Sequence, residues 1–144
     1  MSATNIRWLL DVNLPRVNPT WHSMDLIHAV DLERRPGPSG ITEALRLGRV
    51  LVTRDQSFRG SWHLPVTHSG IVILDGNPVS GEEVLRNLTH LVFCLYRNGQ
   101  EDGIPGRRYV IKTSHAILQV LPDGSENEVE SWKQPRVAVA QMVG

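Results

Sequence analysis

Asp11, Asp55 and Asp75 each follow a short run of apolar residues, so the three carboxylates are candidates for one shared site. Carboxylates gathered at one edge repel one another unless a cation lies between them, and Mg²⁺ or Mn²⁺ suits an all-oxygen site. Such an ion polarises a phosphate oxygen and activates water, which is nuclease chemistry. Aspartate after a strand is also a common helix cap or turn former, so the spacing alone leaves both interpretations open.

The elements that must position these acids are short apolar strands separated by helices and loops. Strands are expected at residues 6–10, 25–32, 50–53 and 71–74, with a closing antiparallel hairpin at 109–112 and 116–120. A short helix is expected between Ser39 and Gly48. A longer one begins at the capping box formed by Ser80 and Glu83, because apolar residues then recur at helical spacing.

Strands that alternate with helical segments, and that are apolar throughout, predict an α/β fold with a largely parallel sheet and an antiparallel C-terminal edge. In such sheets, ligands bind beyond the carboxyl ends of the strands at the point where the strand order reverses. We therefore expect the aspartates to lie along one rim of the sheet. The turn-forming residues 75–78 explain Asp75 equally well.

Composition narrows the class of protein. The 144 residues carry 15 Lys+Arg and 15 Asp+Glu, so the zero net charge argues against bulk electrostatic coating of nucleic acid. Cys94 is the single cysteine, which excludes a disulfide framework and points to a small core residue. With no apolar run of membrane-spanning length and no signal-peptide pattern, we expect a cytoplasmic protein without a membrane partner.

One domain is expected over residues 1–121, because no repeat or composition shift marks a second. Residues 122–144 are expected to form either a C-terminal tail or an added edge strand. Prolines at 15 and 19 make any helix in residues 14–24 brief or irregular.

Two segments of the chain resemble a known family. Residues 9–15 read Leu-Leu-Asp-Val-Asn-Leu-Pro, and residues 48–58 read Gly-Arg-Val-Leu-Val-Thr-Arg-Asp-Gln-Ser-Phe. Both are similar to motifs of the small PIN-like proteins, which are named for the PilT N-terminal domain and often occur as toxins beside antitoxin genes. The resemblance covers about residues 6–121. It implies a three-layer, Rossmann-like PIN fold and Mg²⁺-dependent ribonuclease ancestry.

The resemblance also implies a set of site residues. Asp11 and Asp55 correspond to catalytic metal ligands, and Asn13 to a residue that supports Asp11. Ser57 stands where the family usually has a second aspartate, and can still hydrogen-bond a water on the metal. Glu43 is a displaced substitute for the acids that usually open the second helix, and with Asp75 it is a weaker candidate ligand.

A third departure is Val12, which replaces a family glutamate. These losses leave two functions open. One is Mg²⁺- or Mn²⁺-dependent hydrolysis of RNA. The other is a degenerate PIN-like module that binds RNA, or an antitoxin-like protein partner, without cleaving.

Further residues are candidates for contacts around the rim. Arg16, Arg54 and Arg59 are candidates for phosphate contacts, although salt bridges to the acids would look the same in sequence. Trp21 and Trp62 could stack on unpaired bases or pack over loop backbone. A homodimer through Leu91 and Leu95 is conceivable, but core packing explains both leucines equally well.

Overall fold

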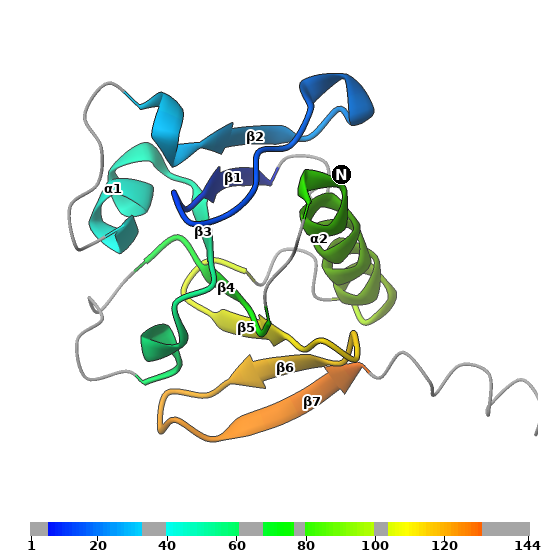
Figure 1. The fold of residues 1–144 in the computed structure, drawn as a ribbon. Helices are drawn as coiled ribbons and strands as arrows, with labels where there is room; N and C mark the ends of the chain where they lie inside the picture. Colours follow the sequence, from blue (N-terminus) through cyan, green and yellow to red (C-terminus); the bar gives the residue numbers. More distant parts are fainter. Residues whose placement is uncertain (1–5, 33–39, 61–67, 77–79, 100–103, 131–144) are drawn as a thin grey trace, which may run out of the picture.

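The computed structural model describes residues 6–32, 40–60, 68–76, 80–99 and 104–130, and these form an α/β fold around one sheet (Figure 1). Within this part of the chain, seven strands pair in the order β2-β1-β3-β4-β5-β6-β7. The strands are β1 (Arg7–Leu10), β2 (Asp25–His28), β3 (Val50–Thr53), β4 (Ile71–Leu74), β5 (Arg108–Ile111), β6 (Ile117–Val120) and β7 (Glu126–Glu130). The pairs β2–β1, β1–β3, β3–β4 and β4–β5 are parallel, whereas β6 pairs antiparallel with both β5 and β7.

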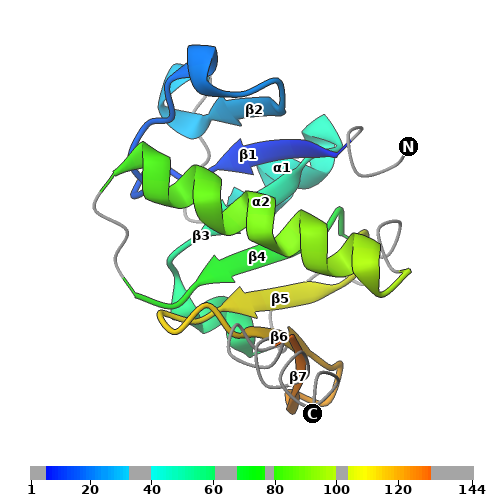
Figure 2. The ribbon, with the colours of Figure 1, turned by 90° about the vertical axis from the view of Figure 1, so that its right-hand side faces the viewer.

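Two helices lie on opposite faces of the sheet, as the two views show (Figures 1 and 2). They are α1 (Gly40–Leu47) and α2 (Gly81–Arg97). Short 3₁₀ helices occupy three of the loops: η2 (Pro19–Trp21), η3 (Ala29–Asp31) and η4 (Gln56–Arg59). None of the helices described is both long enough and apolar enough to cross a membrane.

Hydrophobic clusters fill both faces of the sheet, because successive residues of a strand point to opposite sides. In β3, for example, Val50 and Val52 join the cluster beneath α2, whereas Leu51 joins the cluster on the α1 side. Strands that are covered on both faces must be apolar throughout, which explains the uninterrupted hydrophobic runs. Leu91 and Leu95, for which core packing and a dimer contact were both open, are fully buried in the first cluster.

Most of the expected elements are present, with one clear error. The strands at 50–53 and 71–74, both helices and the antiparallel hairpin are confirmed. The strand expected over 25–32 is wrong in its second half, because β2 ends at His28 and η3 follows. The His28 side chain causes this turn, since its Nδ1 accepts a hydrogen bond from the Val30 amide at 3.1 Å.

Residues 14–24 contain only the short η2, as the prolines predict. Strand β7 pairs with β6 and lies within residues 122–144, which were expected to form either a tail or an added edge strand. Residues 131–144 and Trp62 lie outside the described part of the chain.

The start of α2 is held tightly against the loop that follows β1. The Ser80 hydroxyl caps the helix by accepting a hydrogen bond from the Glu83 amide at 3.2 Å. At the next residue, a Cβ added to Gly81 would lie 1.8 Å from the Arg16 carbonyl oxygen. Only glycine therefore allows this close approach, which fixes the end of α2 nearest the rim.

Gly81→Ala is expected to destabilise the protein by about 1–3 kcal/mol, because the loop or the helix must move to admit a methyl group. Chemical denaturation followed by circular dichroism measures the change. Glu82→Ala is the matched control at the neighbouring exposed position, with an expected change within about 0.5 kcal/mol. Equal effects of the two substitutions would contradict the close contact.

Candidate active site at the sheet rim

Asp11 and Asp55 lie at the carboxyl ends of two strands that are neighbours in the sheet. Asp11 follows β1 and its amide still donates to the Val52 carbonyl of β3 at 2.9 Å, so the parallel pairing continues to the rim. In the sheet, β2 lies on one side of β1 and β3 lies on the other. This reversal of strand order is the switch point at which open α/β sheets bind ligands.

The Thr53 hydroxyl joins the two acidic segments. Its Oγ1 donates to Asp11 Oδ2 at 2.7 Å and accepts from the Asp55 amide at 3.1 Å. The Thr53 side chain is fully buried, so water does not compete for either bond. One hydroxyl therefore fixes the position of the Asp11 carboxylate relative to the backbone that carries Asp55.

Local hydrogen bonds orient each carboxylate further. Asp55 Oδ1 caps η4 by accepting from the amide and the hydroxyl of Ser57, at 3.0 and 2.7 Å. Asp11 Oδ1 accepts from the Val12 amide at 2.7 Å. Asp55 is exposed and its Oδ2 accepts no hydrogen bond from the described residues, so this oxygen can bind a cation or water. Ser57 thus supports Asp55 directly, whichever ligand the site takes.

The two weaker acidic candidates have cationic neighbours. Glu43 is buried in α1 and forms an ion pair with Arg46. Asp75 lies close enough to Arg59 to raise the pKa of that guanidinium, although the Glu126 carboxylate is the larger cause. Among the described residues, no group of three or more His, Cys, Asp or Glu side chains could hold a metal ion. Neither acid therefore completes a three-carboxylate cluster with the rim pair.

The candidate phosphate-binding arginines are largely engaged within the protein. Arg16 forms a two-pronged ion pair with Asp31, with nitrogen–oxygen distances of 2.6 to 3.0 Å. Arg59 binds Glu126 of β7 in the same manner. Arg54 donates to the Asn13 carbonyl at 3.2 Å, which ties together the loops that carry the two rim aspartates.

A cavity of about 600 Å³ lies beside the rim, along the loop between β1 and β2. Its lining includes Arg16, Trp21 and His22, and Trp21 is 52% exposed. The sequence had left Trp21 open between stacking on bases and packing over loop backbone. An exposed indole beside a guanidinium is suited to stacking on an unpaired base.

Two residues that organise the site were not predicted from the sequence. Thr53 lies within the motif at 48–58 but carries no signal for its bond to Asp11, which is 42 residues away. Arg108 is buried and donates to the carbonyls of Phe58, Arg59 and Gly60 at 2.9 to 3.0 Å. It therefore holds the end of η4, the element that Asp55 caps.

Comparison of the chain with protein-family models, with curated proteins and with solved structures gives no match. The resemblance to PIN-like proteins thus remains an interpretation of the two motifs. The link between the Asp11 and Asp55 segments does not depend on that resemblance, since it follows from β1, β3 and Thr53 alone.

Thr53→Val is expected to destabilise the fold by about 1–3 kcal/mol, because it leaves the Asp55 amide and the Asp11 carboxylate without their buried partner. Urea denaturation measures this loss. Thr53→Ser keeps the hydroxyl and serves as the control for the hydrogen bonds, with the smaller cost of one methyl group. A valine variant as stable as the serine variant would show that the hydroxyl does not link the segments.

The Arg59–Glu126 ion pair is expected to make stability depend on pH in the acidic range. The Arg59 guanidinium lowers the pKa of the Glu126 carboxyl below its ordinary 4.5. A carboxyl whose pKa is lower in the folded state stabilises the fold above that ordinary value, and the contribution is lost as pH falls through the folded pKa.

Below about pH 4.5, the melting temperature of Glu126→Gln should therefore fall less steeply with decreasing pH than that of the wild type. Melting temperatures of the wild type and the variant across the range test this expectation. Glu128→Gln, an exposed change on the same strand, is the control. If the melting temperature of Glu126→Gln falls at acidic pH as steeply as that of the wild type, the ion pair contributes nothing to the pH dependence.

Proposed function

We propose that this chain is a divergent PIN-like protein of the toxin type, which binds Mg²⁺ or Mn²⁺ through Asp11 and Asp55 and hydrolyses RNA phosphodiesters. The observation that carries the proposal is the Thr53 hydroxyl, which links the two aspartate segments at the switch point of the sheet. The motif resemblance supports the same assignment.

The donor set fits a hard divalent cation. Mg²⁺ in phosphate-processing sites is commonly held by one or two carboxylates together with substrate phosphates, and it keeps several of its waters. Two aspartates without a third described acid meet that requirement, but they favour weak binding in the absence of RNA. Neither ligand is a thiolate or an imidazole, so the set gives little preference for zinc or copper.

Each residue at the rim then has a definable part. When bound, the cation stabilises negative charge that develops on the phosphate. Asp11 is held by Thr53, and Asp55 is held by Ser57, so neither carboxylate has to reorganise when the substrate arrives. Because Ser57 occupies Asp55 Oδ1, Asp55 Oδ2 is the oxygen that would bind the cation or one of its waters.

The cavity that includes Arg16 and Trp21 supplies a place for the RNA strand. Base stacking on an aromatic side chain contributes about 1–3 kcal/mol per base and tolerates any sequence. The loop at 11–22 connects this cavity directly to Asp11. Unpaired RNA is therefore the substrate form that the arrangement favours.

The second candidate is a PIN-like module that binds RNA or an antitoxin-like protein without cleavage. One observation favours it: Glu43, the substitute for a lost family acid, is paired with Arg46 in α1. A rim with only two acids loses catalysis before it loses binding, because charge stabilisation in the transition state is the more demanding requirement.

Cleavage of unstructured and structured RNA, assayed with Mn²⁺, with Mg²⁺ and with a chelator, tests the hydrolase proposal. Asp11→Asn and Asp55→Asn should each slow cleavage at least about 100-fold, since even outer partners of metal ligands cost 10–100-fold. Asp123→Asn is the matched control, because Asp123 lies in the turn between β6 and β7.

Cleavage that requires the metal and both rim aspartates would support the hydrolase. RNA binding without cleavage would select the second candidate. Cleavage that survives both substitutions would overturn the proposal, because another site would then be responsible.

A further inference from the structure

The turn that begins at Asp11 has no regular helix to hold it in place. A hydrogen bond from the Leu14 amide to the Asp11 carbonyl closes the turn at 3.1 Å. Prolines at 15 and 19 follow, and only the short η2 forms after them. The Thr53 hydroxyl binds the Asp11 carboxylate, but the backbone of the turn decides where that side chain starts. The turn therefore depends on contacts from other elements.

Two side chains hold the carbonyl groups of this turn, one from each strand beside β1. Arg54, which follows β3, donates to the Asn13 carbonyl at 3.2 Å on the surface. His28, the last residue of β2, bonds the Leu14 carbonyl through Nε2 at 2.7 Å. The His28 side chain lies in the interior and the residue is only 6% exposed, so water competes little for its bond. The bond from β2 is thus the stronger of the two.

The two hydrogen bonds of His28 fix which ring nitrogen carries the proton. Nδ1 accepts from the Val30 amide at 3.1 Å, so this nitrogen is unprotonated. A carbonyl oxygen can only accept, so Nε2 carries the hydrogen and donates it to Leu14. Both nitrogens of a buried, neutral imidazole are therefore satisfied. The ring joins the start of η3, which it caps, to the turn that carries Asp11.

A second contact between η3 and the same loop is weaker. Asp31, the last residue of η3, forms the two-pronged ion pair with Arg16. The side chains of Arg16 and Asp31 are 60% and 55% exposed, and ion pairs in such surroundings contribute at most about 1 kcal/mol. Of the two contacts, the buried bond of His28 is therefore the one that fixes the loop.

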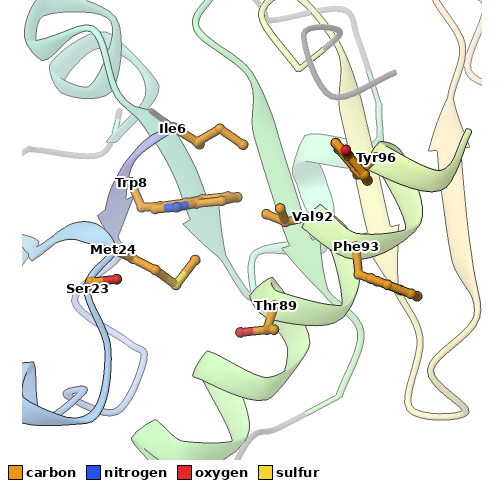
Figure 3. A pocket seen from close by; sticks show the side chains of 8 residues that line it. All are labelled: Ile6, Trp8, Ser23, Met24, Thr89, Val92, Phe93 and Tyr96. Carbon is orange, nitrogen blue, oxygen red and sulfur yellow. The ribbon is translucent and has the colours of Figure 1, made fainter. Parts of the chain in front are cut away.

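Packing around β2 is too open to do the same work. Among the described strands, β2 pairs with β1 alone. The cavity of about 600 Å³ beside the rim reaches His28 and its neighbours on β2. Met24, just before β2, borders an apolar hollow of about 330 Å³ that lies between it and α2 (Figure 3). Because close packing is interrupted on both sides, directed hydrogen bonds must set the distance between β2 and the turn.

We propose that His28 is the positioning residue of the candidate metal site. Through the Leu14 carbonyl, it holds the turn from which Asp11 presents its carboxylate to the cation. His28 also pairs with Leu10 in the sheet, directly before Asp11, so the turn is held at both ends. The inference rests on the proposed function for the cation, whereas the hydrogen bonds of His28 do not depend on it.

Two substitutions separate the roles of the ring nitrogens. His28→Asn keeps an acceptor near the position of Nδ1 and so retains the cap of η3, but its side chain is too short to reach Leu14. His28→Gln places an amide nitrogen near the position of Nε2 and so retains the donor to Leu14. His22→Asn is the matched control, because His22 Nδ1 accepts from the Met24 amide at 3.0 Å, away from the Asp11 turn.

Mn²⁺ titration and amide hydrogen exchange, both followed by NMR, test the proposal. His28→Asn should raise the dissociation constant for Mn²⁺ about three- to tenfold. This is less than the roughly 10–100-fold cost of removing a direct partner of a metal ligand, because His28 acts through the turn. The Leu14 amide should exchange faster, whereas the Asp11 amide, bonded to Val52, should stay protected. His28→Gln and His22→Asn should keep the affinity within about twofold of the wild type.

Three results would overturn the inference. Wild-type affinity for Mn²⁺ in His28→Asn would show that the bond to Leu14 is dispensable. Lost protection at both the Asp11 and Leu14 amides would show that His28 supports the fold as a whole. No recovery in His28→Gln would exclude the donor to Leu14. If the wild type binds no Mn²⁺, the proposed function fails instead, and exchange of the Leu14 amide alone then decides whether His28 holds the turn.

Discussion

The parallel pairing of β1 with β3 is the constraint on which the candidate site depends. Because the chain runs from β1 to β2 on one side and returns to β3 on the other, the ends of β1 and β3 are free of a connecting loop between them. Asp11 and Asp55 follow these two ends, and the buried Thr53 hydroxyl bridges them. A shift of one residue in this register would turn the Thr53 side chain away from Asp11, and the hydrogen bond between them would be lost.

Arginine side chains hold together the elements around that rim. Arg108 gathers the carbonyls at the end of η4, Arg59 ties the same element to β7, and Arg54 bridges the two rim loops. A guanidinium is suited to this task because its donors fan out in one plane and it remains charged when buried. The zero net charge of the chain is thus consistent with basic and acidic side chains that pair mainly with one another.

Local sequence signals predicted the elements, whereas long-range contacts determined the site. The strand at 50–53 and the capping box at Ser80 were readable because hydrophobic runs and caps act within a few residues. The turn at His28 was not predicted. The apolar residues after His28 favour a longer strand, but the hydrogen bond from the Val30 amide to the His28 imidazole ends it. The bridge from Thr53 to Asp11 and the buried Arg108 could not be read, because both depend on how separate strands align.

Paramagnetic broadening of amide resonances by Mn²⁺ in the ¹⁵N-labelled protein tests the central claim most directly, namely that Asp11 and Asp55 share one cation. The account predicts that resonances of residues 11–13 and 53–57 broaden together, with one midpoint, and that excess Mg²⁺ reverses the effect. Asp11→Asn should weaken the broadening in both segments. Broadening of one segment alone, different midpoints for the two, or a response centred elsewhere would contradict the shared site.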